Sequence, residues 1–326
     1  MRLTSISIVV SLIGIFAMTA EAQTQPPLPN TISAEARHMI EAMNAAPAAA
    51  QPSVEDMRKG ITAIQNAVGG MQKQRYPVSV EHTTMAGVPV LVFKPSSGVT
   101  SKGVLMNLHG GGFMVDSGSQ TESIPIAALT GMTVVAVLYR LAPEHSFPAA
   151  VDDAAAVYNE LLKTTKASDM AVFGTSAGAV LSAQLMVRLK DTKTALPAAL
   201  GFFSGSADMT KDGDSEQFLP KMPGGTLRQS VAAYVGSTPT ETPALSPILS
   251  DLHGLPPTLV MTSTRDQLLS QSTLYHRALL RAGVDANLVV FEAMPHAFWA
   301  YILAPESDEA FGIMAKFFKV HLGQLH

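Results

Sequence analysis

The sequence predicts an α/β protein with a mostly parallel central sheet flanked by helices. The first observation is a set of short apolar runs without polar alternation, which is typical of strands buried on both faces. The second is that helical patterns lie between most of these runs. The third is composition, since the chain of 326 residues is 47% hydrophobic and only 15% charged and can bury a large core.

The first 22 residues predict a secretory signal peptide. Arg2 supplies the positive start, 6–18 is an apolar run, and Ala20-Glu21-Ala22 matches a cleavage site. This run is shorter than the roughly 20 residues that span a bilayer, and no other stretch is long enough. We therefore expect an exported protein, periplasmic or secreted, that begins at Gln23 and has no stable membrane insertion after cleavage. A retained membrane anchor is the alternative.

Residues 23–75 form an N-terminal leader with its own helices. Helical patterns cover 33–44 and 53–68, and the first residue of the second pattern, Ser53, is the expected N-cap. Gly69-Gly70 is expected to end this second helix.

From residue 76 onward the pattern changes to strands that alternate with helices. The runs 78–84 and 88–94 alternate across Ala86-Gly87, which predicts an antiparallel pair. The buried strands are expected at 103–108, 133–138, 170–173, 198–203, 258–262 and 286–291. The main helices between them are expected at 149–163, 177–190 and 271–282.

Gly174-Thr175-Ser176-Ala177-Gly178 matches the pattern G-x-S-x-G. It follows an expected strand and opens an expected helix, which is the setting of a nucleophile elbow. A Ser at so sharp a turn projects its hydroxyl outward, and glycines on either side avoid collisions between the two arms. Ser176 is therefore the candidate nucleophile, and a glycine-rich turn with an incidental Ser is the alternative.

His109-Gly110-Gly111-Gly112-Phe113 directly follows another expected strand. Three consecutive glycines allow backbone N–H groups to turn toward one point, as in an oxyanion hole. The N–H of Ala177, at the positive end of its helix, would be a further donor. A phosphate-binding loop is the alternative, but the Lys-Ser/Thr of a P-loop is missing. We interpret His109 as a structural brace of the loop.

A Ser nucleophile needs a general base and a carboxylate that orients it. His296 lies just after the last expected strand, and Asp266 follows the strand before it. Both positions are at the carboxyl ends of parallel strands, where such sheets carry their chemistry. Glu292 remains the alternative acid, although it lies very close to His296 in sequence. The order Ser176, Asp266, His296 is the order that α/β-hydrolases use.

These motifs together resemble the hormone-sensitive-lipase family of esterases within the α/β-hydrolases. The matching stretches lie within residues 76–322 and are 109–113, 139–145, 147–149, 174–178, 246–247, 254–257 and 296–298. The resemblance implies Ser176 as nucleophile, His296 as base and Asp266 as acid.

The resemblance also implies Gly111, Gly112 and Ala177 as oxyanion donors. It further implies an α/β-hydrolase domain over 76–326 with a helical cap, which combines the N-terminal helices with an insertion near 206–235. The chain departs from the family in the acid loop, where Asp-Pro-Leu-x-Asp is replaced by Asp266-Gln267-Leu268-Leu269-Ser270. We therefore expect a less rigid acid loop.

The expected reaction is hydrolysis of short-chain carboxylic esters through an acyl-enzyme. The alternatives are an exported polysaccharide or xenobiotic deacetylase, an amidase on the same site, and a non-catalytic ligand-binding hydrolase homologue. The aromatic residues Phe113, Phe298 and Trp299 are the candidate walls of the substrate pocket, and each has a core position as its alternative.

No cofactor is expected. The chain has no cysteine, and no cluster of His or carboxylate residues has metal-ligand spacing, so no metal site is expected. The net charge of −4 without a basic block argues against nucleic-acid binding. The expected partner is a small-molecule ester. Formation of a homodimer is left as an open alternative.

Overall fold

The computed structural model describes residues 27–45, 52–219, 228 and 231–324. The expected signal peptide and cleavage site lie outside these described residues. Within them, no helix combines the length and the apolar character needed to cross a membrane.

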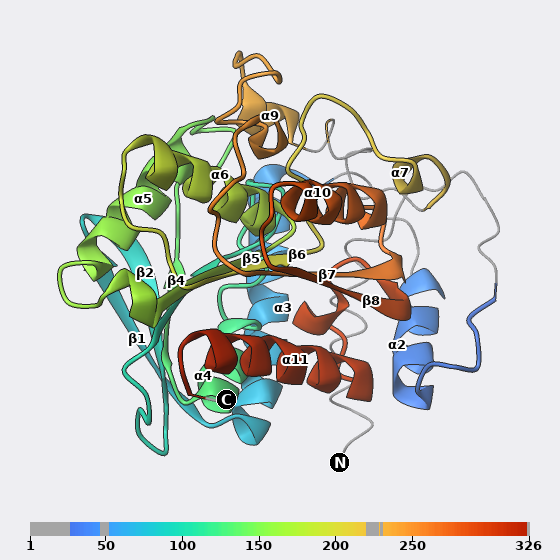
Figure 1. Ribbon diagram of the computed structural model, residues 1–326. Coiled ribbons are helices and arrows are strands. Elements are labelled where there is room, and N and C mark those ends of the chain that lie inside the picture. The colour runs from blue at the N-terminus through green and yellow to red at the C-terminus, as the bar shows by residue number, and fades with distance from the viewer. Residues whose placement is uncertain (1–26, 46–51, 220–227, 229–230, 325–326) are drawn as a thin grey trace.

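The centre of the protein is an eight-stranded sheet in the order β1-β2-β4-β3-β5-β6-β7-β8 (Figure 1). The pairs β1–β2 and β2–β4 are antiparallel, and all other neighbours are parallel. The strands are β1 (Val78–Met85), β2 (Val88–Pro95), β3 (Val104–Leu108), β4 (Thr133–Val137), β5 (Met170–Thr175), β6 (Ala199–Phe203), β7 (Thr258–Arg265) and β8 (Ala286–Pro295). The predicted α/β class and the antiparallel pair at its start are confirmed.

Helices cover both faces of this sheet. The helices α5 (Ala149–Leu161), α6 (Ala177–Asp191) and α10 (Leu269–Arg281) lie on one face, and α4 (Ser123–Thr130) and α11 (Pro305–His321) lie on the other (Figure 1). Successive residues of β3 enter two separate cores, since Leu105 packs on the α4–α11 side and Met106 on the α5–α6 side. This two-sided burial explains why the inner strands show no polar alternation.

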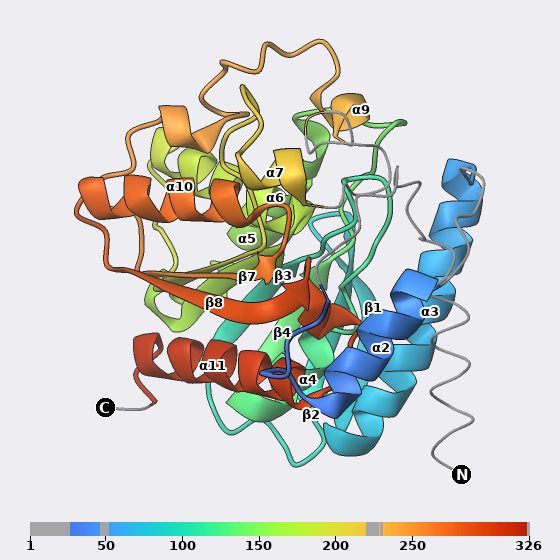
Figure 2. The same cartoon turned by 90° about the vertical axis from the view of Figure 1, so that its right-hand side faces the viewer.

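The leader helices α2 (Ala34–Ala45) and α3 (Val54–Arg75) lie beside the sheet (Figure 2). Ser53 caps α3 as expected, because its side chain accepts from the N–H of Asp56. The expected end of this helix at Gly69-Gly70 is wrong, since α3 continues to Arg75. Glycine costs about 1 kcal/mol in a helix, but here Gly69 allows α3 to approach α4: a Cβ on Gly69 would lie 3.3 Å from Ile124 Cδ1.

The segment between β6 and β7 contains the short helices α7 (Ser215–Phe218) and α9 (Ala232–Val235). Within the expected insertion near 206–235, residues 220–227, 229 and 230 lie outside the described residues. The remaining elements are the short 3₁₀ helices η2 (Ala167–Asp169), η3 (Pro247–Leu249) and η4 (Phe298–Ala300).

Candidate active site

The turn between β5 and α6 has the backbone geometry of an elbow. Ser176 has φ 57° and ψ −121°, an uncommon conformation for a residue with a side chain. A Cβ on Gly174 would collide with the carbonyl of Gly178, and a Cβ on Gly178 would collide with the carbonyl of Leu108. Both positions of the G-x-S-x-G pattern therefore require glycine, and the strained turn presents Ser176 at the start of α6.

The structure brings Ser176, His296 and Asp266 into one hydrogen-bonded chain. His296 Nε2 lies 2.9 Å from Ser176 Oγ, and His296 Nδ1 lies 2.7 Å from Asp266 Oδ1. His296 follows the last residue of β8, and the hydroxyl of Tyr301 donates to the His296 carbonyl at 2.5 Å. A nucleophile, a base and an orienting carboxylate that are hydrogen-bonded in this order can carry out acyl transfer.

Asp266 is fully buried and holds its charge through several contacts. The Thr262 hydroxyl donates to Oδ2 at 3.0 Å, and the Leu268 N–H donates to Oδ1 at 2.9 Å. Burial by itself would raise the pKa of Asp266, but the facing His296 and the backbone N–H of Leu268 hold it below its ordinary value. The alternative acid, Glu292, is exposed, and no hydrogen bond joins it to His296 among the described residues.

The altered acid loop is fixed from a different part of the chain. The Ser215 hydroxyl donates to the Gln267 carbonyl at 2.6 Å and accepts from the Ser270 N–H at 3.0 Å. The Ser215 N–H also donates to Ser270 Oγ at 2.9 Å. Ser215 lies on α7, so the insertion after β6 supplies the contacts that hold the loop. The expectation of a looser loop did not include these contacts, which no local pattern reveals.

The glycine loop after β3 lies directly against the nucleophile. Gly111, Gly112 and Phe113 have φ of 112°, 60° and 62°. A Cβ on Gly110 would lie 3.3 Å from Ser176 Cβ, so the loop and the elbow are in contact. Among the described residues, no acceptor pairs with the N–H groups of Gly111, Gly112 or Ala177. These three groups are therefore free to bind an anionic oxygen near Ser176.

His109 braces the glycine loop, which agrees with our interpretation of this residue from the sequence. Its ring is buried and stacks on Tyr139 with centroids 4.2 Å apart, while Nδ1 lies 2.8 Å from the Gly110 carbonyl. The Tyr139 hydroxyl donates to the His109 carbonyl at 2.6 Å. His109 thus contacts the loop backbone, and no hydrogen bond joins it to Ser176.

Helix α3 supplies two further braces that the sequence did not indicate. Arg58 Nε donates to the Met114 carbonyl at 2.9 Å, and Gln65 Nε2 donates to the Asp116 carbonyl at 2.8 Å. Both side chains come from the leader, more than fifty residues before the loop. A leader helix is therefore part of the support of the candidate oxyanion hole.

The three aromatic residues assigned to the pocket are all buried in the core. The ring of Phe113 stacks on Tyr234 with centroids 3.5 Å apart, which joins the glycine loop to the insertion near α9. Phe298 and Trp299 are in edge contact with each other on η4. A role of these rings in bounding the substrate remains a prediction.

No group of His, Asp or Glu residues within the described ranges has an arrangement that could hold a metal ion.

The chain is also similar to known proteins. Residues 105–300 match a family model described as an α/β-hydrolase fold. An acetyl-hydrolase of Streptomyces hygroscopicus is 32% identical over 231 residues, which cover 68% of this chain and 76% of that protein.

Two solved structures are also similar. The esterase E25 has a TM-score of 0.78 and 31% identity, and the match covers 94% of this chain and 99% of that one. An esterase from the bacterial hormone-sensitive lipase family has a TM-score of 0.76 and 28% identity, with 98% of this chain and 99% of that one covered.

Proposed function

Since this chain belongs to the hormone-sensitive-lipase esterases of the α/β-hydrolase family and is a carboxylic ester hydrolase, we propose that it is a serine esterase for short-chain esters. The single observation that carries the proposal is the hydrogen-bonded chain from Ser176 through His296 to Asp266. These hydrogen bonds give the nucleophile Ser176 a defined acceptor for its proton, the ring of His296.

In the first half of the reaction, Ser176 Oγ attacks the ester carbonyl carbon while His296 Nε2 takes its proton. The tetrahedral intermediate collapses, the bond to the alcohol oxygen breaks, and His296 returns the proton to the leaving alcohol. An acyl-Ser176 remains. Asp266 keeps Nδ1 protonated and stabilises the imidazolium, which its low pKa allows.

In the second half, water repeats the attack on the acyl-Ser176 carbonyl with His296 as base. The carboxylic acid leaves and Ser176 regains its proton. In both halves the negative charge develops on the carbonyl oxygen, and we assign the N–H groups of Gly111, Gly112 and Ala177 to that oxygen. Their free state beside Ser176 supports this assignment.

The preference for short acyl chains follows from the closeness of the insertion to the site. Tyr234 stacks on Phe113 of the glycine loop, and its hydroxyl donates to Gln184 Oε1 on α6 at 2.6 Å. These contacts support a cap, formed by the insertion and the leader helices, that bounds the acyl group. The name of the Streptomyces relative, an acetyl-hydrolase, is consistent with a small acyl group.

The test is a chain-length series of p-nitrophenyl esters beside an acetylated sugar and an anilide. Each buried methylene contributes about 0.8 kcal/mol, so kcat/KM should rise up to butyrate or hexanoate and then fall once the space is full. A steady rise through palmitate would refute the bounded pocket. Faster turnover of the acetylated sugar or of the anilide would instead favour a deacetylase or an amidase.

The nucleophile is tested by Ser176→Ala, with Ser182→Ala as the matched control. Ser182 is also buried on α6, and its hydroxyl donates to the Ala179 carbonyl at 2.8 Å. We expect Ser176→Ala to lower kcat by about 10⁴ to 10⁶ and Ser182→Ala to retain activity. Activity of Ser176→Ala within about tenfold of the wild type would show that Ser176 is not the nucleophile.

We also propose that the protein is exported from the cytoplasm. The pattern of Arg2, the apolar run and Ala20-Glu21-Ala22 supports a periplasmic or secreted enzyme. The absence of cysteine makes the chain compatible with an oxidising compartment.

A further inference from the structure

The buried carboxyl group of Glu122 lies beside the proposed chemistry but takes no part in it. Glu122 follows the glycine loop and immediately precedes α4, and only 2% of the residue is exposed. Its side chain makes no capping hydrogen bond to α4.

Glu122 contacts the residues next to the nucleophile and the base. Trp299 Nε1 donates to Glu122 Oε1 at 3.3 Å and lies at the same distance from Thr175 Oγ1. The Thr175 side chain also stabilises the charged form of this carboxyl group, which lowers its pKa. Thr175 directly precedes Ser176, and Trp299 follows closely after His296. The indole N–H of Trp299 therefore links the elbow, the base loop and the start of α4.

The surroundings of this carboxyl group make its charge unfavourable. Among the described residues, Glu122 Oε2 has no hydrogen-bond partner. A Cβ on Gly118 would lie 2.8 Å from Glu122 Oε2, so a larger residue at position 118 would collide with this carboxyl group. Burial raises the pKa of Glu122 to about 7, and the nearby Asp116 adds to this rise. A group held in such an environment next to reacting residues is typical of a functional role.

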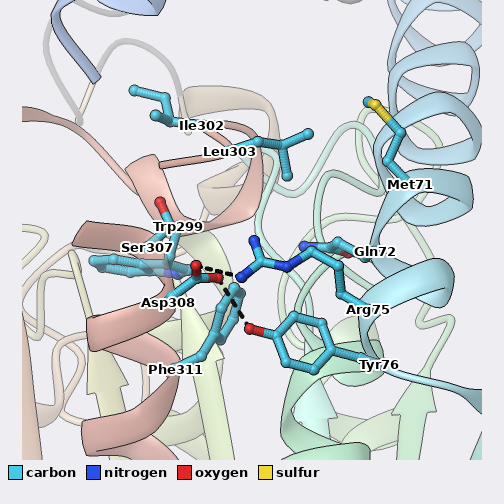
Figure 3. A pocket seen from close by; sticks show the side chains of 10 residues that line it. All are labelled: Met71, Gln72, Arg75, Tyr76, Trp299, Ile302, Leu303, Ser307, Asp308 and Phe311. Atoms are coloured by element: carbon cyan, nitrogen blue, oxygen red, sulfur yellow. Dashed lines mark hydrogen bonds and ion pairs between the residues drawn. The ribbon is translucent and has the colours of Figure 1, made fainter. Parts of the chain in front are cut away.

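Hydrogen bonds as well as packing hold the indole of Trp299. The residue borders a cavity of about 110 Å³ between α3, η4 and α11 (Figure 3). Arg75 and Asp308, which also line this cavity, form an ion pair at 2.6 Å, so these two charges satisfy each other. The indole N–H instead has its partners at Glu122 and Thr175. Those hydrogen bonds fix the orientation of the ring and, with it, the chain just after His296.

We propose that Glu122 is a positioning residue that holds the Ser176 elbow and the His296 loop in register through Thr175 and Trp299. The assignment rests on the proposed function, because it takes Ser176 and His296 as the reacting pair. A displacement of about 1 Å between reacting groups can cost on the order of 100-fold in rate. Loss of this link should therefore lower kcat and leave KM nearly unchanged.

The experiment compares single and double variants on p-nitrophenyl acetate. Glu122→Leu removes the carboxyl acceptor at similar side-chain volume, Thr175→Val removes the hydroxyl, and Thr175→Ser restores it. Glu306→Gln is the matched control, since Glu306 is a part-buried carboxylate that accepts from the N–H and hydroxyl of Ser33. Thermal unfolding of each variant establishes that it is folded before its kinetics are measured.

We expect Glu122→Leu and Thr175→Val each to lower kcat by about tenfold to 100-fold, with KM within about twofold of the wild type. Thr175→Ser and Glu306→Gln should retain the wild-type kcat. The double variant of Glu122→Leu and Thr175→Val should be no slower than the worse single variant, because both changes break one link.

Three results would overturn the proposal. They are a kcat of Glu122→Leu within about twofold of the wild type, additive losses in the double variant, and a Thr175→Ser variant as slow as Thr175→Val. Should Glu122→Leu fail to fold, the pair of Thr175 variants decides alone. A wild type without Ser176-dependent hydrolysis refutes the proposed function and this assignment together. An active wild type with unaffected variants overturns only the role of Glu122.

Discussion

Replacing Glu122 with Gln should make the protein more stable above neutral pH. The pKa of this carboxyl group is about 7 in the folded protein, because of its burial, against an ordinary value of 4.5. Between these two values the unfolded chain releases the proton while the folded protein keeps it. The free energy of unfolding of the wild type therefore falls as pH rises through this range, and the Gln variant lacks this decrease.

The size of the effect follows from the difference of about 2.5 pH units, each worth about 1.4 kcal/mol. The stability of Glu122→Gln relative to the wild type should therefore increase by about 3 kcal/mol between pH 4.5 and pH 8.5. The weakened hydrogen bonds to Trp299 and Thr175 subtract an amount that does not depend on pH. The pH-dependent part of the difference thus isolates the buried carboxyl group.

The assay is urea unfolding of both proteins at several pH values across this range. Glu144→Gln is the control, because the hydrogen bond from Arg58 lowers the pKa of Glu144 to about 2. Its contribution is lost only as pH falls below about 4.5, so the control difference should stay flat across the range. A flat or falling difference for Glu122→Gln would refute the account of its environment.

Three further outcomes test other parts of the account. Asp266→Asn should lower kcat by about 10⁴, because it stabilises the wrong tautomer of the base, whereas Glu292→Gln should lower kcat far less. A larger loss of kcat from Glu292→Gln in steady-state assays would show that the acid is misassigned. Ser215→Ala should lower the free energy of unfolding by about 1–3 kcal/mol and lower kcat as well, and an unchanged protein in urea titration and kinetics would show that the acid loop does not depend on α7. Mass spectrometry of the exported protein should give Gln23 as its first residue, and EDTA should leave activity intact; an uncleaved Met1 or a loss of activity in EDTA would contradict these expectations.

The sheet and the positions of the three candidate site residues could be predicted because their signals are local. The G-x-S-x-G elbow depends on two glycines within five residues, and the collisions at Gly174 and Gly178 show why no other residue fits. The positions of Asp266 and His296 depend only on where strands end, and a parallel sheet brings such ends to one edge. The burial on both faces that removes polar alternation also made the inner strands recognisable.

The supporting residues could not be predicted, because their contacts join distant parts of the chain. Ser215 is 52 residues from Gln267, and Glu122 is 177 residues from Trp299. Neither residue belongs to a pattern that the sequence displays. The error at Gly69-Gly70 has the same origin, since the approach of α3 to α4 is a tertiary contact that overrides the local tendency of glycine to end a helix.

The most direct test of the central claim is to identify the residue that becomes covalently modified. The wild-type protein is treated with a p-nitrophenyl alkylphosphonate, which forms a stable bond to an activated serine, and the peptides are mapped by mass spectrometry. The account predicts one adduct, on Ser176, together with stoichiometric loss of esterase activity, and no adduct in Asp266→Asn under the same brief exposure. A labelled residue other than Ser176, or inactivation without any adduct on Ser176, would contradict it.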